Sequence, residues 1–133
     1  MTPLVLLVDD DTPCLDALER RLTARGYRVC VADTRDAGAQ SLQGDAPHLC
    51  VMNPEADDSG GWELMTECAR ASIPLVLYGP SSLFARRQVL AQITHPLFVK
   101  GVHGYHTVVA AVLEQIADSV TLSSLCKHPH RAA

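Results

Sequence analysis

The sequence is poor in the patterns that mark covalent catalysis and metal binding. Its five cysteines form no Cys-x-x-Cys pair, and its six histidines form no His-Glu-x-x-His motif. No serine lies in a Gly-x-Ser-x-Gly pattern, and no glycine-rich loop follows the first apolar run. These absences argue against a disulfide framework, a zinc protease site, a hydrolase nucleophile and a P-loop or dinucleotide site.

Long apolar runs and an excess of basic residues are also missing. No run approaches the length that spans a bilayer, and the acidic residues 9–11 interrupt the apolar start too early for a signal peptide. The net charge of −4 offers no electrostatic footprint for nucleic acid. Scattered cysteines are typical of a reducing compartment. We therefore expect a cytoplasmic domain that contacts neither membrane nor nucleic acid directly.

What remains is the composition of one globular domain. The chain has 133 residues, of which 47% are hydrophobic and 20% are charged. That size and composition allow a real hydrophobic core and exclude a disordered chain. No repeat or low-complexity segment interrupts the sequence. We expect a domain over residues 1–125 and a C-terminal tail over residues 126–133.

Apolar runs alternate with helical patterns along the chain. The runs predict strands over residues 4–8, 27–32, 49–52, 73–78 and 97–99, of which 27–32 has a more polar face, as an edge strand would. Helical spacing follows each strand, with Thr12 and Thr34 as N-caps, Ser81 or Ser82 as the cap of a helix over 83–93, and a last apolar stripe over 108–120. A helix face over 62–69 uses Trp62, Met65, Cys68 and Ala69. This alternation predicts an α/β domain with a doubly wound five-stranded parallel sheet.

Polar residues occupy the positions where the predicted strands end. Asp9, Asp10 and Asp11 follow the first strand, Asn53 the third, and Lys100 the fifth. Open parallel sheets place their ligands at this edge. Carboxylates beside an amide oxygen suit a hard cation such as Mg²⁺, while the lysine can balance their charge or contact a phosphoryl group.

At these residues the chain resembles the receiver domain of two-component response regulators, which are CheY-like. The resemblance covers roughly residues 4–120 by its pattern of elements. Its specific parts are the acidic segment 8–11, the segment from Pro54 to Leu64 and the lysine that ends the fifth strand. It implies a flavodoxin-like fold with strand order 2-1-3-4-5.

The departures from the family's pattern are more informative than the matches. Counting back from Gly61-Trp62-Glu63-Leu64 places Asn53 where typical receivers carry the phosphoacceptor aspartate. Gly79 stands in place of the Thr or Ser that follows the phosphoryl group, and Leu97 in place of the aromatic switch residue. Asp9, Asp10 and Lys100 keep the family's residues. An amide oxygen is a far poorer nucleophile than a carboxylate, so this pattern indicates a degenerate receiver.

From this pattern we expect no enzyme activity and no required cofactor, with weak Mg²⁺ binding by Asp9 and Asp10 at most. Without a metal, Lys100 should pair with Asp9 or Asp10. The expected function is a phosphorylation-independent protein-interaction module in bacterial-type signalling, with homodimerisation left open. The resemblance implies a protein-binding face of helix 4, strand 5 and helix 5, near Arg86, Arg87, Leu90, Leu97, Val102 and Tyr105.

A second function remains open at this point. Gly79 carries no side chain and so enlarges the crevice at the strand ends. A flavodoxin-like domain could use that space to bind a nucleotide or another small ligand, so the alternative is a ligand-binding domain.

Overall fold

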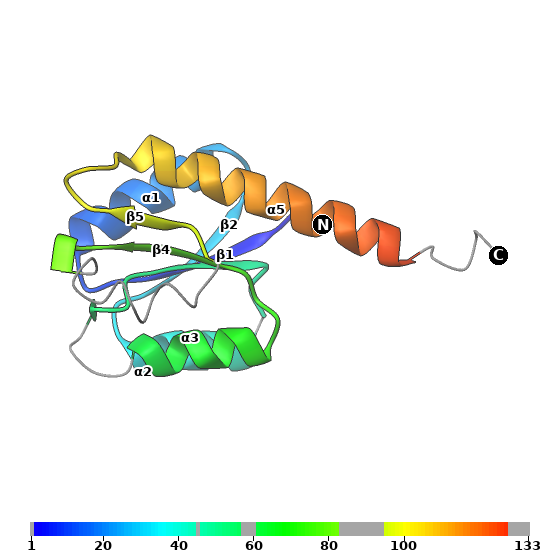
Figure 1. The fold of residues 1–133 in the computed structure, drawn as a ribbon, viewed down its shortest axis with the longest axis horizontal. Coiled ribbons are helices and arrows are strands. Elements are labelled where there is room, and N and C mark those ends of the chain that lie inside the picture. The colour runs from blue at the N-terminus through cyan, green and yellow to red at the C-terminus, as the bar shows by residue number, and fades with distance from the viewer. Residues whose placement is uncertain (1, 45, 57–60, 83–94, 128–133) are drawn as a thin grey trace.

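The computed structural model describes residues 2–44, 46–56, 61–82 and 95–127. Five parallel strands form one sheet in the order β2-β1-β3-β4-β5 (Figure 1), which confirms the predicted topology. The strands are β1 (Leu4–Val8), β2 (Arg28–Ala32), β3 (Leu49–Met52), β4 (Leu75–Gly79) and β5 (Leu97–Val99). The helices within the described residues are α1 (Thr12–Ala24), α2 (Arg35–Gln43), α3 (Gly61–Arg70) and α5 (Tyr105–Lys127).

The sheet separates two hydrophobic cores because successive strand residues point to opposite faces. Helices α1 and α5 cover one face, and α2 and α3 cover the other (Figure 1). In β1, Val5 and Leu7 pack into the α1–α5 core, while Leu6 and Val8 pack into the α2–α3 core. All five residues of β1 are buried, as expected for a central strand with helices on both sides. The partly exposed β2 lies at the sheet edge, as predicted.

Glycine is required where α2 crosses β1. A Cβ at Gly38 would lie 2.9 Å from Leu64 Cδ2 and 3.3 Å from Val8 Cγ2, so a larger residue would push α2 away from both. Close packing explains why a glycine sits inside this helix in spite of its low helix propensity.

Several local expectations differ from the structure. The N-cap of α1 is Asp11 and not Thr12, because the Asp11 carboxylate accepts a hydrogen bond from the Cys14 N–H at 3.3 Å. Met65 and Cys68 of α3 are buried as predicted, but Ala69 is exposed, and Leu64 takes its place in the core. The helix expected over 83–93 lies outside the described residues.

The last helix is longer than its apolar stripe. It continues beyond residue 120 to Lys127, so it includes the first two residues of the predicted tail, and residues 128–133 lie outside the described residues. Within the described part of the chain, none of the helices combines the length and the apolar character that a membrane span requires.

Helix α3 ends in a left-handed turn at Ser72, whose φ is +58°. The Ser72 N–H donates to the Ala69 carbonyl at 3.1 Å, and the Ile73 N–H donates to the Cys68 carbonyl at 2.9 Å. This pair of bonds is the Schellman pattern, in which the left-handed position usually carries glycine. Ile73 is buried and so fixes the chain's entry into β4.

We predict that Ser72→Gly stabilises the domain. A residue with a Cβ costs about 1–2 kcal/mol in the left-handed conformation, and Ser72→Gly removes that cost. The greater freedom of glycine in the unfolded chain offsets about 0.5–1 kcal/mol of this gain. The net gain should be about 0.5–1 kcal/mol in the free energy of unfolding, measured by urea denaturation. Ser72→Ala keeps Cβ at the same φ and is the control. An equal gain from both variants would show that the hydroxyl and not the backbone causes the effect.

Candidate functional site

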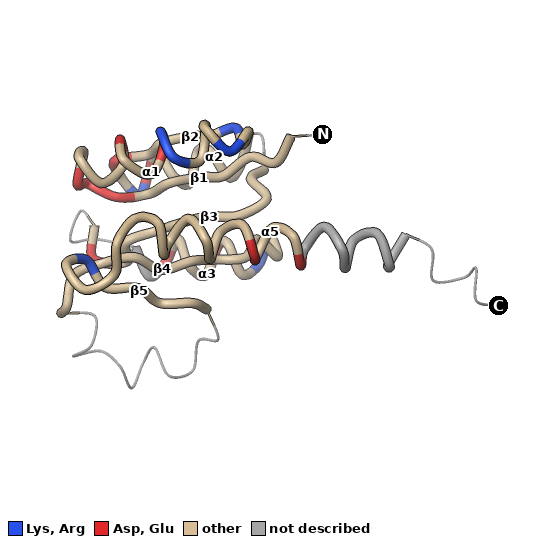
Figure 2. The backbone as a smooth tube through the Cα atoms, turned by 90° about the horizontal axis from the view of Figure 1, so that it is seen from above, with Lys and Arg blue, Asp and Glu red and all other residues tan. Residues whose placement is uncertain are grey.

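The hydrogen bonds of the parallel sheet bring the polar strand ends together. The Asn53 N–H donates to the Val8 carbonyl at 2.9 Å, which places Asn53 beside Asp9. The Lys100 N–H donates to the Gly79 carbonyl at 2.9 Å, so Lys100 enters the same end of the sheet from β5. Figure 2 shows the acidic segment directly after β1. Asp9, Asn53, Gly79 and Lys100 therefore meet, as the strand-end argument predicts.

Asp9 is the centre of this cluster. Its carboxylate is only 7% exposed, so its charge is stable only if donors surround it. Oδ2 accepts from Lys100 Nζ at 2.5 Å, and Oδ1 accepts from Asn53 Nδ2 at 3.1 Å. Oδ1 also accepts from the Asp11 N–H at 3.3 Å. A cation, a side-chain amide and a backbone amide together replace the water that burial removes.

Lys100 bridges two carboxylates. Besides Asp9, its Nζ donates to Asp11 Oδ2 at 3.1 Å, and its side chain is 21% exposed. The carboxylates in these two salt bridges belong to Asp9 and Asp11, whereas Asp10 is exposed. The expectation that Lys100 pairs with Asp9 or Asp10 is therefore confirmed by the bond to Asp9, and Asp11 is a further partner that the sequence did not predict. Asp11 takes part because its cap on α1 already holds its carboxylate near the strand end.

Asn53 connects the cluster to the next loop. Its Nδ2 donates to Asp9, and its Oδ1 accepts from the Glu55 N–H at 2.9 Å, so both ends of the amide are used. It is only 6% exposed. A carboxylate here would place an acceptor against the Asp9 oxygen, where the amide now donates. The neutral amide thus suits a site whose cation is a lysine.

A possible metal group involves other residues than predicted. Ligand atoms of Asp9, Asp11 and Cys14 lie within 4.8 Å of one another, while the predicted pair was Asp9 and Asp10. The two carboxylates are already paired with Lys100. Burial raises the pKa of the Cys14 thiol to about 12, so the thiolate that binds metals is scarce at neutral pH. The group therefore carries no metal assignment.

A small cavity lies beside Asp9 and Asn53. Its volume is about 10 Å³, enough for about one water molecule, and its walls also include Val8, Met52 and Tyr78. Ligand sites typically measure about 300–1,000 Å³, so this cavity is too small to be one. Gly79 does not line it, so the alternative function, in which Gly79 opens the crevice to a small molecule, stays a prediction.

The protein-binding face that the resemblance implied is only partly described. Arg86, Arg87 and Leu90 lie outside the described residues. Leu97 is half-buried and packs against the α2–α3 core. Val102 is 72% exposed in the turn between β5 and α5. Tyr105 is half-buried at the start of α5.

Sequence reasoning missed the aromatic support of Lys100. Lys100 Nζ lies 6.0 Å from the centre of the Tyr78 ring, and the Tyr78 hydroxyl donates to the His103 carbonyl at 2.9 Å. Burial raises the pKa of Tyr78, which keeps this hydroxyl protonated as a donor. Tyr78 lies one residue before the strand end, so a search limited to strand-end residues could not find it.

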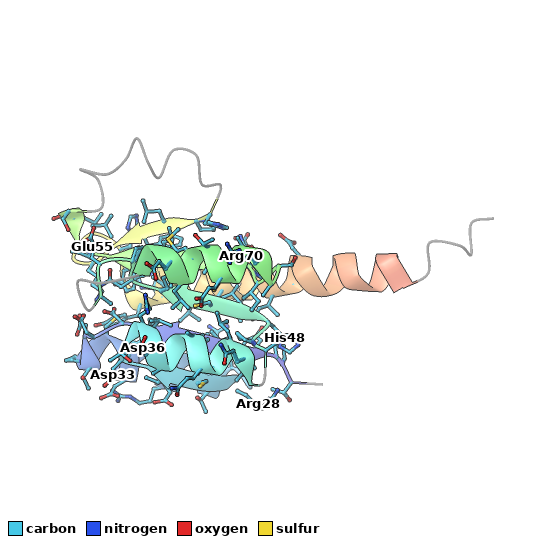
Figure 3. All side chains as sticks on the ribbon, turned by 90° about the horizontal axis from the view of Figure 1, so that it is seen from below. Arg28, Asp33, Asp36, His48, Glu55 and Arg70 are labelled. Carbon is cyan, nitrogen blue, oxygen red and sulfur yellow. The ribbon has the colours of Figure 1, made fainter. Side chains whose placement is uncertain are left out.

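Among the residues labelled in Figure 3, Asp33, Asp36 and Glu55 lie toward one end of the sheet, and Arg28, His48 and Arg70 lie toward the other. Asp36 is paired with Arg35 at the start of α2.

We predict that Lys100→Met destabilises the domain by about 2–3 kcal/mol. Breaking a buried pair typically costs about 3–5 kcal/mol, and the partial exposure of Lys100 reduces that figure. The loss arises because the variant removes the cation that contacts the buried Asp9 side chain. Urea denaturation at pH 7 measures it, with the exposed Arg70→Met as control. Equal stability of Lys100→Met and the parent would show that the pair does not hold the site together.

The same difference should depend on pH. Burial opposes the shift, but the hydrogen bonds to Asp9 and Asp11 raise the pKa of Lys100 above 10.5. Its contribution is therefore present below pH 10.5 and lost as pH rises through the folded pKa. Burial likewise opposes the shift at Asp11, yet the Lys100 hydrogen bond lowers its pKa below 3.8, so that contribution is lost as pH falls through the folded value.

We therefore expect the stability difference between parent and Lys100→Met to be largest between about pH 4 and pH 10 and to shrink toward both extremes. Denaturant titrations of the two proteins over this range give the difference directly. A difference that stays constant from pH 3 to pH 11 would contradict an ionic origin.

Comparisons with known proteins agree with this geometry. No family model matches the chain. The chain is 36% identical over 61 residues to the photosynthetic apparatus regulatory protein RegA of Rhodobacter capsulatus, a match to 46% of this chain and 33% of RegA. It is 32% identical over 76 residues to the transcriptional regulatory protein AfsQ1 of Streptomyces coelicolor, a match to 56% of this chain and 34% of AfsQ1. The matched part is thus about a third of each relative.

The solved structures extend the likeness to nearly the whole chain. The receiver domain protein (CheY-like) of Methanospirillum hungatei superposes with a TM-score of 0.78 at 18% identity, covering 91% of this chain and 98% of that chain. At this identity the agreement concerns the fold. The sheet order and the coverage lead to one conclusion: the chain has the fold of CheY-like response regulator receiver domains.

Proposed function

We propose that this domain is a degenerate receiver that works in two-component-type signal transduction without phosphorylation, as a protein-interaction module and not as an enzyme. The proposal rests mainly on the position and the hydrogen bonds of the Asn53 side chain. It occupies the strand end where the resemblance places the phosphoacceptor, and its amide is bonded at both ends, to Asp9 and to the Glu55 N–H. It supplies neither a carboxylate nucleophile nor a free oxygen.

The charge balance supports metal independence. In this site Lys100 supplies the positive charge, because its ammonium contacts both Asp9 and Asp11. A divalent cation at Asp9 would have to displace this ammonium from a carboxylate that is almost fully buried. Phosphotransfer by receivers depends on such a cation, according to the resemblance. The site therefore disfavours the reaction in two ways: Asn53 lacks the carboxylate nucleophile, and Lys100 occupies the carboxylates that would bind the cation.

The response machinery is also reduced. The resemblance assigns the groups that respond to phosphate to positions 79 and 97, and these are glycine and leucine here. A single designed knockout would leave both groups intact. We infer that the domain keeps one conformation, which its partners recognise as it stands. The face expected to bind them has three described residues, of which Leu97 and Tyr105 are half-buried and Val102, between β5 and α5, is exposed.

The first test is chemical. We expect that acetyl phosphate with Mg²⁺ adds no phosphate to the domain, because the position beside Asp9 holds an amide. Intact-mass spectrometry after treatment measures this, with Asn53→Asp treated in parallel as the matched variant. A stoichiometric gain of one phosphate on the parent, mapped to Asp9, Asp10, Asp57 or Asp58, would refute the proposal.

The second test restores the carboxylate. Asn53→Asp replaces the donor Nδ2 with an acceptor near Asp9, and two like charges about 4 Å apart repel by about 1–4 kcal/mol. We expect the variant to melt at a lower temperature in EDTA and to recover when Mg²⁺ is added, while the parent responds to neither. Thermal denaturation with and without Mg²⁺ separates these cases.

Asn53→Asp should not restore signalling, because Gly79 and Leu97 still lack the groups that respond to phosphate. Partner binding with and without phosphodonor checks this point. If Asn53→Asp alone regains phosphorylation-dependent binding, one residue accounts for the loss of switching, and the proposal of a degenerate receiver fails.

A further inference from the structure

Helices α1 and α5 lie side by side on one face of the sheet (Figure 1). A groove is lined by residues of both helices. Its volume is about 350 Å³, far larger than the cavity at the strand ends. The walls are short helical stripes, with lining residues Arg21 and Ala24 on α1, Arg25 at the C-cap of α1, and His106, Val109, Ala110 and Leu113 on α5. Spacings of three and four residues place each stripe on one side of its helix.

The floor of the groove is apolar and shallow because two opposed residues are alanines. Val109 is buried, and Leu113 packs against the core between the helices and the sheet. Ala24 and Ala110 are exposed, and a larger side chain at either position would fill the space. The groove thus exposes aliphatic surface without breaking the core below it.

The walls carry positive charge without a carboxylate partner. Across the described ranges, the salt bridges belong to Arg35 and Lys100, and none includes Arg21 or Arg25. Arg21 is nevertheless held in place. Its Nη1 donates to the Ala17 carbonyl at 3.3 Å, and its guanidinium lies 5.1 Å from the centre of the Tyr105 ring.

A cation in the last turn of a helix is favourable on its own, so the arginines by themselves indicate nothing. Their combination with exposed aliphatic residues in a hollow between two helices is different. We propose that this groove docks an acidic amphipathic helix of a partner protein, with its apolar side chains on Ala24, Ala110 and Leu113 and its carboxylates on Arg21 and Arg25. The inference extends the proposed function, on which it rests only in that the domain acts by binding protein.

Charge and exposure select this occupant. Two parallel helices with a hollow between them match the helix-in-groove mode, in which anchors recur at i, i+3, i+4 and i+7. Most lining residues are exposed, so a small molecule would stay largely in water, whereas ligand pockets bury most of their ligand. A second copy that docks through the same groove would set arginine against arginine. A net charge of −4 opposes nucleic acid.

The test uses two synthetic helical peptides of about 18 residues with the same leucine stripe. One carries glutamates beside the stripe and the other carries lysines. We expect the glutamate peptide to bind at 0.1 M salt, with amide shifts of the labelled domain confined to residues 21–25 and 106–113. The lysine peptide should bind at least about tenfold more weakly.

Two variants and one control test the residues. Arg21→Glu combined with Arg25→Glu should weaken the glutamate peptide by about tenfold or more and strengthen the lysine peptide. Ala110→Leu, which fills the groove and leaves the charges, should weaken both peptides. Arg20→Glu changes the charge on an exposed position of α1 that does not line the groove, and binding should stay within about twofold of the parent. Thermal melts confirm that each variant is folded.

Several outcomes would overturn the proposal. These are equal binding of the two peptides, an equal effect of Arg20→Glu and the double variant, or shifts that map elsewhere. Tighter binding of a single-stranded oligonucleotide than of the glutamate peptide would assign the arginines to nucleic acid. Self-association in sedimentation that the double variant abolishes would assign the groove to a second copy. Each of these leaves the phosphorylation test unaffected, so the two proposals fail separately.

Discussion

The contact between the Lys100 ammonium and the buried Asp9 carboxylate is the constraint on which the strand-end cluster depends. Three consecutive aspartates follow β1, and the first of them is held almost entirely out of water. A buried carboxylate without a cation would cost several kcal/mol. One lysine from the far strand of the sheet supplies that cation and contacts Asp11 as well. The chain itself therefore supplies a cation to its most deeply buried carboxylate.

This solution explains the residue at the end of β3. Asp9 Oδ1 needs a donor, and the amide of Asn53 provides one while its carbonyl oxygen accepts from the next loop. An aspartate would add a third negative charge to two carboxylates that already share one ammonium. The neutral amide thus avoids further repulsion at the buried Asp9 carboxylate.

Much of this arrangement could be predicted from the sequence. Short apolar runs bounded by turn residues predicted the strands, because strands buried on both faces have few other patterns. The resemblance to receiver domains supplied their order. The ends of β1, β3 and β5 then placed Asp9, Asn53 and Lys100 together. The choice between Asp10 and Asp11 could not be made in this way, since it depends on which carboxylate caps α1. Three adjacent aspartates look alike in the sequence, and only the direction of the first helical turn separates them.

The groove and the aromatic contacts lay beyond such reasoning for a different reason. Arg21 and Tyr105 are 84 positions apart in the chain, and no periodicity connects them. Yet the Tyr105 ring packs edge to face against the Tyr78 ring, with 6.3 Å between the ring centres. The same Tyr105 ring also contacts the Arg21 guanidinium. Packing of this kind depends on the offset between α1 and α5, which helix patterns alone do not determine.

The short length of β5 limits how long the salt bridge between Lys100 and Asp9 stays closed. This strand has three residues, two of them only half-buried, and it lies at the edge of the sheet. Edge elements with few buried contacts open locally at a lower free energy than the whole domain unfolds. When β5 opens, Lys100 leaves with it and Asp9 is exposed to solvent and ions. The shielding of Asp9 from solvent therefore lasts only while β5 stays paired with β4.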